Sequence, residues 1–143
     1  MCGIIGYTNN VSNNQSVIEN MLQKISHRGP DDQGYYQDSK ITLGMRRLSI
    51  IDLDSGNQPL FNEDKSLILV FNGEIYNYQV LRAKLISLGH TFTTNSDSEV
   101  IIHGYEEYGN DIVNHLRGMF AFAIYNIHTK ALFIARDIFG IKP

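Results

Sequence analysis

The sequence of 143 residues has one cysteine, Cys2, no surplus of basic residues and no long apolar run. One cysteine cannot form a disulfide within the chain, so we expect a reducing compartment, the cytoplasm. The 12 lysines and arginines against 15 aspartates and glutamates give a net charge of −3. This balance favours neither nucleic acid nor an anionic membrane as a partner. No apolar run reaches the ~18 residues that a membrane-spanning helix needs.

Two further absences narrow the expectations. The N-terminus lacks a basic segment followed by an apolar stretch, so we expect no signal peptide. The five histidines, at positions 27, 90, 103, 115 and 128, are widely spaced and have no second cysteine beside them. This spacing argues against zinc, and we predict no metal site. What is present, 43 % hydrophobic and 19 % charged residues, is typical of one globular domain.

Local patterns in the first half predict strands with one helix. A strand starts at Cys2 with "CGIIGYT", and a helix covers about residues 12–26. The turn-rich "HRGPDDQG" follows, and "ITLGMRRLSIID" is a strand that runs into a loop. The segment "SLILVFNGEIYN" is a buried strand, which we expect to be interrupted by a tight turn at Asn72-Gly73.

The second half predicts helices and then a hairpin. "YQVLRAKLISLG" is an amphipathic helix ended by Gly89. Ser96 and Glu99 match a capping box, which would make Asp97 the first helical residue, near the positive end of the helix dipole. A short helix at about 111–116 precedes two strands joined at 126–130. This order favours an α+β fold with antiparallel sheets.

Eight short motifs then occur in a recognisable order: "MCGIIGY", "RGPDDQG", "RLSIID", "QPL", "NGEIYN", "SDSEV", "LRGMFAFAI" and "ARDIFGIKP". Together they closely resemble the N-terminal glutaminase domain of glutamine-hydrolysing asparagine synthetases. These are class II glutamine amidotransferases, a branch of the N-terminal nucleophile hydrolases. Relatives that make glucosamine-6-phosphate usually have R-G-Y-D-S where this chain has "RGPDD". The asparagine synthetase branch is therefore favoured.

The resemblance implies a four-layer αββα sandwich and the hydrolysis of glutamine to glutamate and ammonia. Residues 2–143 would form the glutaminase domain, incomplete at its C-terminus, and the ATP-dependent synthetase domain would be absent. That synthetase domain is the expected partner in the full-length chain and would use ATP and Mg²⁺. The glutaminase domain itself needs no cofactor, and a homodimer is compatible with the family.

The family reaction proceeds through a thioester on Cys2. A cysteine thiol is only a few per cent thiolate at neutral pH and needs a base. Removal of Met1 would give Cys2 its own α-amine, with an ordinary pKa of about 8. While Met1 remains, that nitrogen is an amide and cannot act as a base. The alternative is that Cys2 only fills apolar space at the start of a strand.

By resemblance, the Asn72 side chain and the Gly73 backbone N–H stabilise the tetrahedral oxyanion. The alternative, a simple hairpin turn, explains Asn-Gly but not the whole "NGEIYN" match. Arg47 resembles the residue that binds the substrate α-carboxylate, and a guanidinium can do so with two parallel hydrogen bonds. Asp97, helped by Glu74, resembles the α-ammonium partner.

Each binding residue has a plainer alternative. Arg46 and Arg47 are adjacent and would point to opposite faces of a strand, so only one can line the pocket, and a surface ion pair is the default for either. Asp97 could simply serve the helix dipole. His27 and Arg28 look structural, and we assign no chemistry to Arg136 or Asp137.

Two other functions stay open on the sequence. The chain could be a binding or regulatory module that keeps the fold without turnover. It could also belong to a related amidotransferase whose ammonia acceptor is a sugar, as in polysaccharide pathways, because the acceptor is chosen by another domain.

Overall fold

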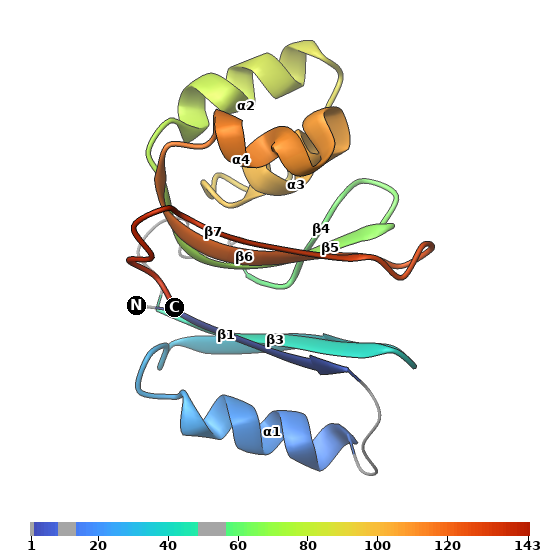
Figure 1. Ribbon diagram of the computed structural model, residues 1–143, viewed down its shortest axis with the longest axis vertical. Coiled ribbons are helices and arrows are strands. Elements are labelled where there is room, and N and C mark those ends of the chain that lie inside the picture. The colour runs from blue at the N-terminus through green and yellow to red at the C-terminus, as the bar shows by residue number, and fades with distance from the viewer. Residues whose placement is uncertain (1, 9–13, 49–56) are drawn as a thin grey trace.

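The computed structural model describes residues 2–8, 14–48 and 57–143, which form two antiparallel sheets stacked between layers of helices (Figure 1). The first sheet has the strand order β1 (Gly3–Thr8), β3 (Ile41–Arg47), β2 (Asp32–Gln37). The second has the order β4 (Leu60–Phe61), β5 (Leu67–Ile75), β6 (Gly118–Asn126), β7 (Leu132–Arg136).

Helices cover the outer face of each sheet (Figure 1). Helix α1 (Asn14–Lys24) covers the first sheet. Helices α2 (Tyr78–Ser87), α3 (Glu99–Tyr108) and α4 (Ile112–His115), with the 3₁₀ turn η1 (Gly109–Asp111), cover the second. The expected four-layer αββα sandwich is confirmed. No helix in the described ranges is long and apolar enough to cross a bilayer.

Strand β5 is buried on both faces, because side chains alternate between the two sides of a strand. Ile68 and Val70 belong to the core between the sheets, together with Met45 of β3. Leu69 and Phe71 belong to the core between the second sheet and its helices. The even-numbered residues of β5 therefore face the other sheet and the odd-numbered ones face the helices.

A polar link also joins the two sheets. The Asp38 carboxylate accepts hydrogen bonds from Tyr125 Oη at 2.9 Å and Lys130 Nζ at 3.0 Å, and from the backbone N–H groups of Lys40 and Ile41. Burial raises the pKa of Asp38, but these donors outweigh it and hold that pKa well below its usual value. Burial and the hydrogen bond to Asp38 raise the pKa of Tyr125 to about 12.

The predicted turn at Asn72-Gly73 is wrong. Both residues lie within the continuous strand β5, where Asn72 pairs with Ala121 and Gly73 pairs with Phe120 of β6. A long antiparallel partner pairs with all nine residues of β5, and this pairing overrides the local turn preference of Asn-Gly. The glycine serves a close approach instead, because a Cβ at Gly73 would lie 2.3 Å from Met119 O.

The predicted capping box is also wrong. Helix α3 begins at Glu99 with Ser98 as its N-cap residue, so Asp97 precedes the helix. The Glu99 carboxylate accepts hydrogen bonds from the backbone and hydroxyl groups of Thr93 and Thr94 rather than from Ser96. These four donors bind a carboxylate more completely than one N–H in a capping box would.

Other expectations have mixed outcomes. The β6–β7 hairpin is confirmed, and so is the helix that ends near Gly89, whose φ of +106° favours glycine. Strand β2 was missed, because its "DQGYYQ" follows directly on a turn-rich stretch. The predicted start of the first helix at residue 12 and the loop after "RL" lie outside the described residues.

Candidate active site

Strand alternation directs several of the predicted site residues into the gap between the sheets. Cys2 packs against the core between the sheets. Arg47 is on the same face of β3 as Met45. The β1–β3 register pairs Gly3 with Arg46. Extending this register by one residue places Cys2 opposite Arg47. Asn72 and Glu74 are on the even-numbered face of β5, which looks toward the same gap.

Cys2 is half-buried immediately before β1 and is held from two sides. Its Sγ accepts a hydrogen bond from Leu48 N at 3.4 Å and lies 3.7 Å from Leu48 O. Its carbonyl oxygen accepts one from Arg28 Nε at 3.1 Å. Arg28 therefore positions the cysteine without touching its sulfur, in line with the structural role expected for it.

The two adjacent arginines point to opposite faces, as alternation requires. Arg47 is 5 % exposed, and its Nη1 donates to Asn57 Oδ1 at 3.0 Å. Arg46 donates to Gln33 Oε1 of β2 at 2.8 Å instead. Of the two, Arg47 is thus the one directed into the gap.

The "HRGPDD" loop packs directly behind Arg47. Asp31 N donates to Arg47 O at 3.1 Å. A Cβ at Gly29 would lie 2.4 Å from the carbonyl carbon of Arg46, so only glycine allows this approach. The loop therefore fixes the end of β3 that carries the guanidinium.

Asn72 is buried near the C-terminal end of β5, and its Nδ2 donates to Pro143 O at 3.4 Å. The segment that brings Pro143 there is folded by Arg136, which donates to the carbonyl oxygens of Gly140 and Lys142. Asp137 accepts hydrogen bonds from the N–H groups of Phe120 and Phe139. The Arg136–Asp137 pair thus has a clear structural role beside Asn72.

Asp97 lies at the end of β5 and is 6 % exposed. Its Oδ2 accepts a hydrogen bond from Ile75 N at 2.7 Å. Burial raises the pKa of this carboxyl, the hydrogen bond from Ile75 lowers it, and the negative charge of Glu74 raises it, with a net increase. Ionised Asp97 is therefore costly to keep in place, and a bound cation would relieve that cost.

The structure gathers the predicted residues at one end of the sandwich. The start of β1 and the end of β5 lie on the same side of the molecule, where the chain also reaches Pro143 (Figure 1). Cys2 and Arg47 come from the first sheet, Asn72, Gly73 and Glu74 from the second. Asp97 joins them through its bond to Ile75.

Sequence reasoning missed two features. The positioning bond from Arg28 to Cys2 depends on a contact across 26 residues, for which no local signal exists. The expectation that spacing keeps the histidines apart is wrong for His90 and His103, whose ring centroids are 5.0 Å apart, because chain distance does not limit spatial distance. With Glu63 and Glu106 they form a cluster on the helical side of the second sheet.

An αββα sandwich with a cysteine opening the first strand of one sheet defines an N-terminal nucleophile hydrolase fold. The solved structure of a glutamine phosphoribosylpyrophosphate amidotransferase from Bacillus subtilis matches 99 % of this chain and 38 % of its own, with a TM-score of 0.77 and 22 % identity. A structure described as the allosteric regulatory enzyme of purine biosynthesis matches 74 % of this chain and 25 % of its own, with a TM-score of 0.60 and 27 % identity.

The model of the glutamine amidotransferase domain matches residues 1–143, so the chain belongs to that family. It is 47 % identical to asparagine synthetase [glutamine-hydrolyzing] 1 of Bacillus subtilis, covering 100 % of this chain and 23 % of that protein. It is 45 % identical to asparagine synthetase [glutamine-hydrolyzing] 2 of Arabidopsis thaliana, covering 100 % of this chain and 25 % of that protein. The chain thus spans about a quarter of the length of these relatives.

Proposed function

We propose that the chain hydrolyses glutamine to glutamate and ammonia, with Cys2 as the nucleophile. The observation that carries this proposal is the placement of the one cysteine at the end of the gap between the sheets, opposite Arg47 and on the side where β5 ends with Asn72 and Glu74. Membership of the amidotransferase family supports it.

The first half of the reaction needs a base and an oxyanion site. With Met1 removed, the Cys2 α-amine accepts the thiol proton, and the thiolate attacks the amide carbon of glutamine. Asn72 Nδ2 and the Gly73 N–H donate to the developing oxyanion, and the long 3.4 Å contact from Asn72 to Pro143 O is one that substrate can replace. The α-ammonium proton then goes to the leaving nitrogen, which departs as ammonia.

The second half returns the enzyme to its starting state. Water gives a proton to the α-amine and attacks the thioester carbon. The same two donors stabilise the second oxyanion, and the C–S bond breaks to release glutamate and the Cys2 thiolate. That thiolate recovers its proton from the α-ammonium, so atoms and charges balance over the cycle.

Substrate recognition in this proposal uses the charged groups at the gap. Arg47 binds the α-carboxylate, and because it is buried, the hydrogen bonds it makes are shielded from water. Asp97 binds the α-ammonium, and Glu74 adds negative charge. The raised pKa of Asp97 supports this role, because a bound cation would offset the cost of keeping the buried carboxylate ionised. A glutamine side chain then reaches toward Cys2.

The test combines activity with covalent labelling. We expect a Cys2→Ala variant to lose glutaminase activity and a glutamine-like diazoketone to add one equivalent to the wild type but none to Cys2→Ala. Intact-mass analysis should show active protein beginning at Cys2. Measurable turnover by Cys2→Ala would refute the nucleophile. Met1 retained in fully active protein would refute the α-amine as base. Met1 retained in protein without activity would favour a binding or regulatory module.

We further propose that the ammonia serves ATP-dependent synthesis of asparagine from aspartate, in a longer protein of which this chain is the glutaminase part. The names of the relatives with 43–47 % identity support this acceptor. ATP and Mg²⁺ would bind in the synthetase domain, and the proposed site of action is the cytoplasm, with a homodimer as the proposed assembly. The full-length protein should form asparagine from aspartate, glutamine and Mg-ATP. If a sugar is the acceptor instead, aspartate will not be consumed.

A further inference from the structure

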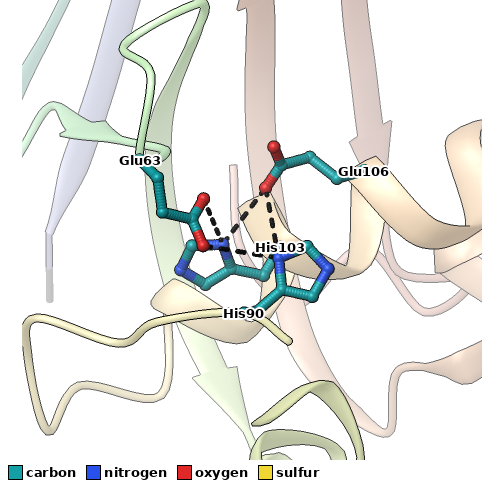
Figure 2. A group of neighbouring side chains, drawn as sticks. All are labelled: Glu63, His90, His103 and Glu106. Carbon is teal, nitrogen blue, oxygen red and sulfur yellow. Dashed lines mark hydrogen bonds and ion pairs between the residues drawn. The ribbon is translucent and has the colours of Figure 1, made fainter. Parts of the chain in front are cut away.

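Two histidines and two glutamates from three separate segments meet on the helical side of the second sheet (Figure 2). Glu63 lies between β4 and β5, and His90 follows the end of α2. His103 and Glu106 are three residues apart in α3, so they share one face of that helix. The second sheet lies between helices α2 and α3, beside which this cluster sits, and the gap that holds Cys2 (Figure 1).

Each of the four groups offers one ligand atom, and these atoms all lie within 4.8 Å of one another. His103 Nδ1 lies 3.1 Å from Glu106 Oε2 and 3.4 Å from Glu63 Oε2. His90 Nδ1 lies 3.5 Å from Glu63 Oε1 and 3.6 Å from Glu106 Oε2. A tetrahedral zinc ion with bonds of about 2.0–2.1 Å places its ligand atoms about 3.3–3.4 Å apart. These four nitrogen–oxygen separations, of which the two to Glu63 involve different oxygens, bracket that value.

The other nitrogen of each histidine is directed at a further carboxylate. His90 Nε2 lies 2.9 Å from Glu107 Oε1, and His103 Nε2 lies 3.5 Å from Glu99 Oε1. A proton on each Nε2 leaves each Nδ1 lone pair directed at the centre. Metal-binding histidines usually have this arrangement, in which a carboxylate behind the ring fixes its tautomer and orientation.

The two central carboxylates are oriented in the same way. Glu106 Oε1 accepts a hydrogen bond from Asn62 Nδ2 at 2.8 Å, which leaves Oε2 facing both histidines. Glu63 Oε1 accepts one from Thr91 N at 3.0 Å. His90, Glu63 and Glu106 are therefore each held by a second hydrogen bond, whereas the buried His103 Nε2 lies near Glu99 without a hydrogen-bond partner in the described residues.

Charge and access also suit a cation. Four carboxylates surround two imidazoles, so the cluster keeps a net negative charge even with both rings protonated. A cavity of about 320 Å³ is lined by Glu63 and His103, among other residues, and offers an approach to one side of the cluster. His103 is almost fully buried, and His90 is 12 % exposed at the side chain.

We propose that Glu63, His90, His103 and Glu106 bind one divalent transition-metal ion, with zinc as the best match to two imidazoles and two carboxylates in a tetrahedron. The ion joins the β4–β5 loop, the turn after α2 and the middle of α3, so it has a structural role in the helical layer. Because the site is remote from Cys2, this inference does not depend on the proposed glutaminase activity.

The experiment is a zinc titration of the untagged, chelator-treated protein, carried out in a Cys2→Ala background so that the thiol cannot bind the ion. Competition with a chromophoric chelator gives the affinity, and Co²⁺ gives a visible spectrum that reports the geometry. We expect one zinc ion per chain with a Kd of about 1 µM or tighter. Zinc at 100 times its Kd should raise Tm by roughly 5–10 °C.

Variants separate a metal site from a network of ion pairs. His90→Ala should weaken zinc binding by more than roughly 100-fold, and Glu107→Gln, which changes only the group behind His90, by about 10-fold. His128→Ala, at an exposed histidine outside the cluster, is the matched control and should bind zinc normally. Circular dichroism confirms that each variant is folded. Binding weaker than about 100 µM, or equal affinity in His90→Ala and His128→Ala, would overturn the proposal.

Discussion

Replacing Asp97 by asparagine separates the substrate-binding role of this residue from its effect on stability. Asparagine is nearly the same size as aspartate, and its side-chain oxygen can still accept the hydrogen bond that Ile75 N now donates at 2.7 Å. Only the negative charge is lost. If Asp97 binds the α-ammonium of glutamine, loss of one partner of a buried charge pair costs about 2–5 kcal/mol. We therefore expect KM to rise by roughly 30-fold to several thousand-fold.

The same variant should be more stable than the wild type at neutral pH, although it binds glutamine more weakly. The pKa of Asp97 is raised above its unfolded value of about 3.9. Its contribution to stability is therefore full below that unfolded pKa and is lost as pH rises through the raised pKa. Because asparagine does not ionise, Asp97→Asn should have a higher Tm than the wild type at pH 7, with the difference shrinking toward pH 4.

Two assays check this reasoning, glutaminase kinetics as a function of glutamine concentration and thermal unfolding from pH 4 to pH 8. In the wild type, KM should also rise on acidification at a pH above the usual range for aspartate, since protonated Asp97 cannot pair with an ammonium. Asp111→Asn removes the same charge from an exposed side chain and should change neither KM nor the pH profile. An unchanged KM, or a lower Tm at pH 7, in Asp97→Asn would contradict the assignment.

Three other changes test separate parts of the structure. Gly73→Ala keeps the backbone N–H but forces a methyl group against the backbone of β6, so we expect a loss of about 1–3 kcal/mol in unfolding free energy and a fall in kcat as the N–H is displaced, and an unchanged unfolding free energy would contradict the close packing of Gly73 on β6. Asp38→Asn should lower the unfolding free energy by about 1.5–3 kcal/mol at pH 7. Because the pKa of Asp38 is lowered, this difference from the wild type should persist above pH 4 and vanish as acid protonates the wild-type carboxyl, and a pH-independent difference would argue against the charge. Arg28→Ala should slow diazoketone labelling of Cys2 by up to about 100-fold with little change in Tm, and an unchanged rate would show that the bond to the Cys2 carbonyl has no positioning role.

Hydrophobic patterning in the sequence was sufficient to predict most of the helices and strands. The buried strand β5, the helix α2 and the β6–β7 hairpin followed from local sequence, because apolar runs and turn residues mark them, although α2 buries only Leu81 and Leu85. The errors occurred where a distant partner decided the outcome. Strand β6 extends β5 through Asn72-Gly73, and Thr93 and Thr94 bind the carboxylate that was assigned to a capping box.

The residues of the candidate site could not be predicted from hydrophobic patterning. Its residues came from resemblance to a family, and the structure adds the faces on which they lie. Alternation along β3 could show that only one of Arg46 and Arg47 points inward, but not which, since that depends on the packing of Met45 against the second sheet. The four-layer arrangement also came from the resemblance, because layering is a property of tertiary packing. The metal cluster had no local signal, since its ligands lie in three segments.

The alternation of β5 has a consequence for how this chain tolerates insertions and deletions. Adding or removing one residue between Leu67 and Asn72 would exchange the two faces of everything that follows, or break the ladder to β6. Phe71 or Gly73 would then face the first sheet, while Asn72 would be forced into the apolar core under the helices. The turn at 126–130 connects β6 and β7, and a change in its length alters no strand register, although Lys130 there contacts Asp38. Length variation among homologues should therefore be frequent at that turn and absent from β5, even where single substitutions within the strand are accepted.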